Sequence, residues 1–197
     1  MAADPDSSVR RFNPRRPTWP IVLLRVSIGL VWAIDASFKW TPTFRSSYAS
    51  TLTDAAKDQP GWLHWWFTFW VNLQSPHPIF FAYLVAVVET LLAFMLVFGF
   101  ARKVAYVGGA VYGFLLWGTA EGFGGPYSPA STDIGTGIIY VIVFFALLAL
   151  SDRQGAEAWS LDALIDRGVG WWHWVADVGG HRSRTGLRSD RQAEQSQ

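Results

Sequence analysis

The stretch that decides the fold runs from Ile79 to Phe100 and reads IFFAYLVAVVETLLAFMLVFGF, with Glu89 as its one charged residue. A helix crosses a hydrocarbon core of about 30 Å with roughly 17 to 25 apolar residues at about 1.5 Å each, so this run predicts a membrane span. Three more stretches meet the same requirement: Ile21–Trp40, Val104–Ala120 and Ile134–Leu150. The sequence therefore predicts an all-α integral membrane protein whose four spans form a four-helix bundle.

The composition of the 197 residues agrees with this prediction. Hydrophobic residues make up 51% of the chain and charged residues 16%, whereas an average soluble domain is roughly a quarter charged. The formal net charge of +1 provides no basic surface for a nucleic acid, so we expect no nucleic-acid partner. The sequence has no cysteine, which excludes a disulfide framework, an iron–sulfur cluster and a thiolate zinc site.

Basic residues predict the orientation of the spans, because short loops rich in Lys and Arg stay in the cytoplasm. They precede the first span, form the turn between the second and third, and follow the fourth: Arg10, Arg11, Arg15, Arg16; Arg102, Lys103; Arg153, Arg167, Arg182, Arg184, Arg188 and Arg191. The loop 122–132 has none. We therefore expect both termini in the cytoplasm and a multi-pass protein of the plasma membrane. A cleaved signal peptide is the alternative for the first span, and Arg25 inside that run argues against it.

The chain divides into three predicted parts. Residues 1–18 form a basic, disordered N-terminus, residues 19–151 form the membrane domain, and residues 152–197 form a cytoplasmic amphipathic helix and a flexible tail. In the outer loop we expect a short helix within Ser46–Asp58, followed by the Trp-rich run Trp62–Val71. Tryptophan is typical of the membrane–water boundary, so this run predicts an interfacial helix. The amphipathic helix near Ala156 is predicted from the spacing of Leu161, Leu164, Ile165 and Val169.

Ionisable residues within the spans are the candidates for function, because each costs about 2.5 to 3.5 kcal/mol in hydrocarbon unless it is paired or hydrated. Arg25 and Glu89 lie near the midpoints of the first two spans, so we predict a buried ion pair between them. One interpretation makes this pair a structural clamp. The other makes Glu89 a proton carrier, with Asp133 as the second candidate.

The outer end of the bundle holds the second group of candidates. The topology brings Asp35, Lys39, Glu121 and Asp133 to one level, beside the glycine-rich segment that links the third and fourth spans. Lys39 with a helix N-terminus could hold a small anion, and the alternative is that Lys39 only pairs with the carboxylates. The candidate substrate-binding residues are Lys39, Asp35, Glu121, Tyr127 and Thr132.

Helical periodicity predicts which faces of three spans point into the bundle. These faces are Arg25, Gly29, Trp32, Asp35 and Lys39 in the first span, Tyr106, Gly109, Gly113, Trp117 and Glu121 in the third, and Asp133, Gly137, Tyr140 and Phe144 in the fourth.

None of the four histidines (His64, His77, His173, His181) lies in a span. A haem or di-iron site in the bundle would need histidine ligands there, so we expect no haem and no metal.

Three segments resemble the DoxX family of bacterial membrane proteins and the related DoxD proteins. The first runs from Leu23 through Gly29 to Lys39, and the second contains Glu89, then Leu96-Val97-Phe98-Gly99 and Arg102. The third, Gly124 to Gly135, is closer to DoxD, the small subunit of thiosulfate:quinone oxidoreductase. The resemblance covers about residues 20–151 and implies a four-helix membrane bundle with Arg25, Lys39, Glu89 and Arg102 at recurring polar positions. Asp35 departs from the family pattern, which has a glycine-containing stretch before the lysine.

The activity that the resemblance implies is thiosulfate oxidation coupled to quinone reduction, together with a second subunit. We therefore expect a subunit of a redox complex in a bacterial inner membrane, with quinone as its cofactor in an apolar groove and the sulfur anion at Lys39. As partners we expect the lipid membrane and either a second subunit or further copies of this chain. Two alternative functions remain. One is a non-catalytic membrane anchor or assembly factor for a partner redox enzyme. The other is a small-solute transporter.

Overall fold

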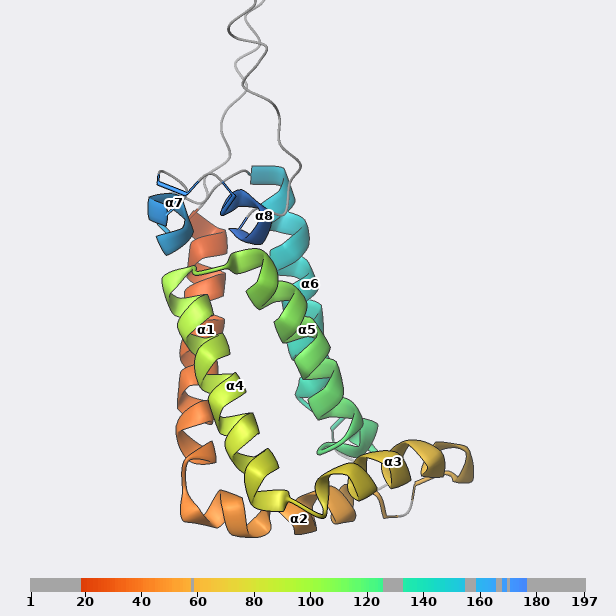
Figure 1. Cartoon of the computed structure of the whole chain (residues 1–197). Helices are drawn as coiled ribbons and strands as arrows, with labels where there is room; N and C mark the ends of the chain where they lie inside the picture. The colour runs from red at the N-terminus through yellow and green to blue at the C-terminus, as the bar shows by residue number, and fades with distance from the viewer. Residues whose placement is uncertain are drawn as a thin grey trace, which may run out of the picture.

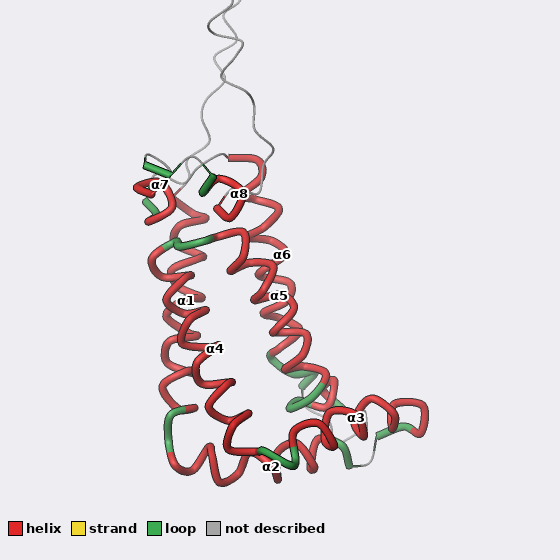
Figure 2. Tube along the Cα trace, viewed as in Figure 1, coloured by secondary structure: helices red, strands yellow, loops and turns green. Residues whose placement is uncertain are grey.

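The computed structural model describes residues 19–57, 59–125, 133–154, 159–165, 168–169 and 171–176, and these residues form an all-α protein (Figure 2). The predicted disorder of residues 1–18 and the predicted flexible tail lie outside the described residues, the tail from residue 177 onward. The α-helices within the described ranges are α1 (Trp19–Lys39), α2 (Pro42–Ala55), α3 (His64–Gln74), α4 (Pro78–Phe98), α5 (Arg102–Gly118), α6 (Gly137–Gln154), α7 (Leu161–Ile165) and α8 (His173–Ala176).

Four long helices form the body of the molecule, α1 packed along α4 and α5 packed along α6 (Figure 1). The helices α2 and α3 cross one end, while α7, α8 and the start of α1 lie at the other. In the described part of the chain, α1 and α4 are long and apolar enough to cross a membrane, judged by length and composition. The apolar stretch of α6, Gly137–Ser151, and the 17 residues of α5 are shorter.

The helix α1 lies against the last turns of α4 because Gly29 leaves room for them. A Cβ atom on Gly29 would lie 2.9 Å from the backbone nitrogen of Val97. Three residues along α1, the indole of Trp32 is 1% exposed and packs against the rings of Tyr112, Tyr140 and Phe144. Trp32 therefore joins the α1–α4 pair to the α5–α6 pair, and this confirms the inward face predicted for the first span.

Small residues also bring α5 and α6 together. A Cβ on Gly109 would lie 2.4 Å from Cζ of Phe144, and Gly113 faces Gly137 and Val141. Glycines spaced four apart allow such close approach between helices. The faces predicted for the third and fourth spans thus meet each other.

Gly109→Ala is expected to destabilise the protein by about 2 kcal/mol, since the added methyl group has no room beside the Phe144 ring. Thermal unfolding in mild detergent measures this loss. Gly108 is the matched control because a Cβ there meets nothing within 4 Å. Gly108→Ala should leave the melting temperature unchanged or raise it, since alanine favours helix over glycine. Equal melting temperatures for the two variants would contradict the predicted role of Gly109.

The helix α2 begins four residues before the predicted start at Ser46. The Thr41 side chain accepts a hydrogen bond from the Phe44 backbone nitrogen at 3.3 Å, and Pro42 occupies the first turn. Thr at the N-cap followed by Pro is a helix start signal.

In the Trp-rich run, a 3-10 turn (Gly61–Leu63) leads into α3, and this confirms the prediction that the run is helical. One side of the turn and α3 is exposed, with Trp62, Trp65, Phe69 and Leu73.

The end opposite α2 and α3 is held by Asp162 of α7, a residue that the sequence prediction placed in an amphipathic surface helix. Its side chain is 1% exposed. Its Oδ1 accepts hydrogen bonds from the Ala101 nitrogen at 2.7 Å and from Nε1 of Trp172 at 2.9 Å. Its Oδ2 accepts from the backbone nitrogen of Arg102 at 3.0 Å and from Nε of Arg102 at 3.1 Å. A carboxylate at a helix N-terminus satisfies free N–H groups and faces the positive end of the helix dipole, so Asp162 caps α5.

Candidate functional site

A cavity of about 540 Å³ lies beside α2 and α3, at the end of the bundle remote from Asp162. All four long helices, α2, α3 and the segment after α5 contribute to its walls. Its lining is mostly apolar and includes Phe81, Leu84, Val85, Val88, Leu115, Leu116 and Trp70. Its polar side chains include Asp35, Lys39, Tyr48, Gln74, Tyr112, Glu121 and Thr136. Volume and lining of this kind are typical of a site for a small organic molecule.

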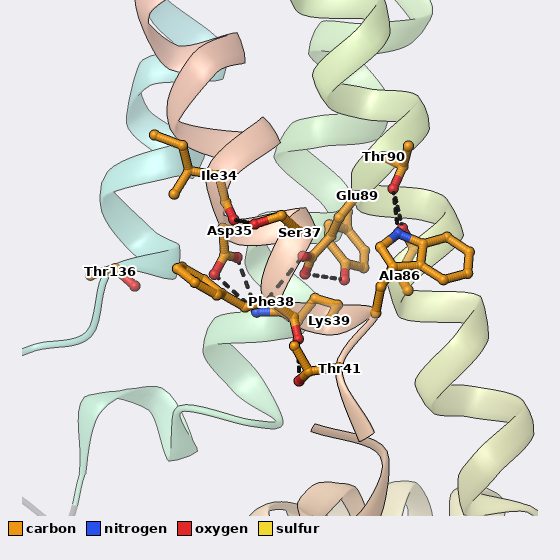
Figure 3. Close-up of polar contacts among 12 residues, drawn as sticks. Ile34, Asp35, Ser37, Phe38, Lys39, Thr41, Ala86, Glu89, Thr90 and Thr136 are labelled. Atoms are coloured by element: carbon orange, nitrogen blue, oxygen red, sulfur yellow. Dashed lines mark hydrogen bonds and ion pairs between the residues drawn. The ribbon is translucent and has the colours of Figure 1, made fainter. Parts of the chain in front are cut away.

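A charged cluster from α1, α4 and α5 forms one wall of this cavity (Figure 3). The Lys39 Nζ atom lies 3.0 Å from Oδ2 of Asp35 and 3.7 Å from Oε2 of Glu89. The Tyr112 hydroxyl donates a hydrogen bond to Oε1 of Glu89 at 2.9 Å. Lys39, Asp35 and Tyr112 line the cavity, whereas the side chain of Glu89 is fully buried behind them. A proton moving between Glu89 and the cavity would therefore pass through Tyr112 or Lys39.

The predicted ion pair between Arg25 and Glu89 is wrong. The Arg25 Nη1 atom donates to the Leu96 carbonyl at 2.6 Å and to the Val97 carbonyl at 3.3 Å, and Nη2 donates to the Trp159 carbonyl at 3.0 Å. Leu96 is seven residues beyond Glu89, about 10 Å along the helix. The two helices do not align by their midpoints, because Gly29 packs at the last turns of α4. Arg25 thus satisfies carbonyls at the C-terminus of α4, where a cation is favourable.

Lys39 pairs with carboxylates, as the alternative to an anion site predicted. Asp35 and Glu89 both lie within 4 Å of its ammonium group, and the carboxylate of Glu121 lines the same cavity. An incoming anion would meet the negative charges of these groups as well as the one lysine. The geometry is therefore better suited to an uncharged ligand than to a sulfur anion at Lys39.

Two other predicted residues have separate environments. Glu121 accepts hydrogen bonds from the Thr136 hydroxyl at 2.6 Å and from the Gly137 nitrogen at 2.9 Å, so it caps α6 while lining the cavity. Asp133 is exposed, and its Oδ1 accepts a hydrogen bond from the Gly135 nitrogen at 3.1 Å. Asp133 does not line the cavity, so the structure does not bring it to Glu89. The candidates Tyr127 and Thr132 lie outside the described residues.

The helices α2 and α3 cover the end of the cavity and are fastened by three hydrogen bonds. The Tyr48 hydroxyl donates to Oε1 of Gln74, Nε2 of Gln59 donates to the Gly122 carbonyl at 3.1 Å, and Nε1 of Trp66 donates to the Gly118 carbonyl at 2.7 Å. Burial raises the pKa of Tyr48 to about 12, so its hydroxyl stays protonated and remains a donor at neutral pH.

Sequence analysis missed Tyr112, Tyr48 and Gln74 as parts of the site. The sequence did contain a clue to Tyr112: a tyrosine hydroxyl within an apolar helix needs a hydrogen-bond partner, and Glu89 in the second predicted span is a suitable acceptor. Tyr48 and Gln74 had none, because the sequence does not determine how the loop between the first two spans folds over the bundle.

Comparison with known proteins adds no relative: no family model, no curated protein and no solved structure matches this chain. Among the described residues, no group of three or more Asp, Glu or His side chains is placed to hold a metal ion. The case for function therefore rests on the cavity and its charged wall.

Proposed function

We propose that this protein is the quinone-binding membrane subunit of a redox complex, similar in type to thiosulfate:quinone oxidoreductase. One observation carries the proposal: a fully buried carboxylate, Glu89, is bonded to a tyrosine and faces a lysine at the wall of a largely apolar cavity. Quinone reduction needs an apolar site for an uncharged ring and groups that supply two protons. This cavity offers both.

The surface of the bundle supports a place within the membrane. Each long helix carries large apolar side chains in exposed positions, among them Leu30 and Ile34 of α1, Leu91 and Phe94 of α4, Val107 and Val111 of α5, and Ile142 and Phe145 of α6. A soluble protein seldom exposes apolar surface on this scale. We place all four helices across the plasma membrane, with α2 and the tryptophans of α3 at its outer surface and the Arg102 turn in the cytoplasm.

In the proposed reaction, thiosulfate is oxidised on the partner subunit and the quinone is reduced on this protein. Two thiosulfate ions join through a new sulfur–sulfur bond to give tetrathionate and release two electrons, and the quinone takes up these electrons with two protons to give the quinol. The Tyr112 hydroxyl lines the cavity and donates a hydrogen bond to Glu89, so it connects the two: a proton that Tyr112 gives up at the cavity wall is replaced from Glu89 once that carboxyl has taken up a proton. The thiosulfate reaction itself is inferred from the resemblance to DoxD. The carboxylates around Lys39 favour placing the anion on the partner.

Glu89→Gln tests the proposed role of Glu89. The amide keeps the shape and a hydrogen bond to Tyr112 but cannot supply a proton, so quinone reduction by the complex should fall on the order of 100-fold. The measurement is thiosulfate-dependent reduction of decylubiquinone by membranes that contain the variant, normalised to the amount of protein. Thr90→Val is the control, because Thr90 neighbours Glu89 on α4 and bonds only Trp40 and Ala86 among the described residues.

The same variant separates the proposal from the alternative of a non-catalytic anchor. An anchor in which Glu89 is purely structural predicts a lower amount of Glu89→Gln protein with unchanged turnover per molecule. That result would contradict the proton-carrying role. Normal abundance with strongly reduced turnover is the result that we expect.

A further inference from the structure

We propose that the cavity opens sideways, between α4 and α5, so that its ligand arrives from the hydrocarbon core of the membrane and leaves an apolar chain in that opening. This inference rests on the proposed function, which places the four long helices in a membrane. It specifies the ligand class as a lipid-soluble molecule with a compact polar head and an apolar tail, such as a prenylated quinone.

Other sides of the cavity are bounded by packed side chains or by hydrogen bonds, and between α1 and α6 the ring of Trp32 packs against Tyr140. Beside the cavity, Trp40 after α1 donates a hydrogen bond to the Thr90 hydroxyl of α4 at 3.1 Å and packs against Tyr83, and Gly113 and Gly137 bring α5 against α6. Towards α2 and α3, the bonds from Tyr48 to Gln74, from Gln59 to Gly122 and from Trp66 to Gly118 tie the covering helices together and to the end of α5. At this end of the bundle, these hydrogen bonds therefore separate the cavity from water.

The side between α4 and α5 is loosely packed and carries a run of apolar lining residues. These two helices are joined by a short turn, yet they contact each other far less extensively than α4 contacts α1 or α5 contacts α6 (Figure 1). Five apolar residues line the cavity from these two helices, namely Leu84, Val85 and Val88 of α4 and Leu115 and Leu116 of α5. Leu84 both lines the cavity and is 44% exposed. The apolar wall of the cavity is thus continuous with the outer surface of the bundle at Leu84.

The polar and apolar ends of the cavity fit a head and a tail. Asp35 and Lys39 of α1 and the Tyr112 hydroxyl of α5 provide hydrogen-bonding groups at one wall, whereas Leu84, Val85, Val88, Leu115 and Leu116 line the path towards Leu84 with apolar side chains. A ring with carbonyl oxygens can bond to Lys39 or Tyr112 while its tail follows Val88 and Leu84 outward. A water-soluble ligand would gain nothing from that apolar path.

A photoreactive phospholipid tests the opening without any quinone. The full-length protein is placed in phosphatidylcholine vesicles that contain a lipid with a diazirine on its acyl chain, and the labelled residues are identified by mass spectrometry. We expect label on Val85 and Val88 as well as on the exposed Leu91, and none on Leu92 or Leu96, which are buried and do not line the cavity. Val85 and Val88 labelled no more than Leu92 would overturn the proposal.

A matched pair of substitutions tests the position of the opening. Leu91 lies two helical turns from Leu84 on the same face of α4 and is 55% exposed, but it does not line the cavity. Leu84→Trp should lower the label on Val88 severalfold, whereas Leu91→Trp should leave it unchanged. Equal labelling of Val88 in the two variants would place the opening elsewhere and contradict the proposal.

Added decylubiquinone then distinguishes this inference from the proposed function. Competition that removes the label from Val88 and not from Leu91 supports both. Lipid label on Val88 that decylubiquinone does not reduce supports the sideways opening and counts against quinone as the ligand.

Discussion

Asp162→Ala is expected to lower the free energy of unfolding by about 4 kcal/mol, the largest effect that we predict for a single residue. The carboxylate is 1% exposed and accepts four hydrogen bonds, two of them from the first backbone N–H groups of α5. Its removal leaves these donors buried and takes away the carboxylate that faces the guanidinium of Arg102. Thermal or SDS-induced unfolding of the purified protein measures the loss.

Asp54→Ala is the matched control for Asp162. Asp54 also pairs with a basic side chain, Lys57, at 2.6 Å, but both partners are exposed. Exposed pairs contribute about 0 to 1 kcal/mol, so this variant should unfold almost as the wild type does. Similar stabilities for the Asp162→Ala and Asp54→Ala variants would contradict the role of Asp162 as the cap that holds the C-terminal segment to the bundle.

Lys39→Met should cost about 3 kcal/mol of unfolding free energy, because it leaves the buried carboxylate of Glu89 without the cation that faces it. Among the described residues, Oε2 of Glu89 receives no hydrogen bond, so Lys39 is the group that offsets its charge there. Adding Glu89→Gln removes the charge and should restore most of the lost stability. A double-mutant cycle measures this coupling.

The control for Lys39 is Lys57→Met in the exposed turn after α2, which should change stability by less than about 1 kcal/mol. A Lys39→Met loss that the second substitution fails to reverse would show that Lys39 acts through its packing near Phe44, where it lies 5.3 Å from the ring centroid. In that case the pairing of Lys39 with Glu89 would not be the source of its effect.

The helices and their inward faces could be predicted because local patterns determine them. The glycines at 109, 113 and 137 and the aromatic Phe144 lie on one side of their helices by periodicity alone, and the structure packs them together. Length and apolar composition located the four long helices to within a few residues. The Thr41-Pro42 start of α2 was present in the sequence as well and was overlooked.

The ion pairing could not be predicted because it depends on how far one helix is shifted along another. Aligning the midpoints of the first two spans paired Glu89 with Arg25, whereas the contact at Gly29 shifts the helices so that Lys39 reaches Glu89 instead. Asp162 contacts Ala101 and Arg102, and Gln74 contacts Tyr48, all distant in sequence. No local sequence pattern predicts these contacts. The resemblance to DoxX and DoxD proteins drew attention to Lys39 and Glu89 but did not indicate that they face each other.

Identification of the lipophilic molecule that purifies with the protein tests the quinone proposal most directly. The protein is isolated from its own membranes in mild detergent, and the extracted small molecules and co-purifying proteins are identified by mass spectrometry. We predict about one prenylated quinone per chain, together with a redox partner subunit, and loss of the quinone in a Val85→Trp variant that fills the cavity. A Leu91→Trp variant should retain it. Stable wild-type protein that carries no quinone and no redox partner would contradict the proposed function.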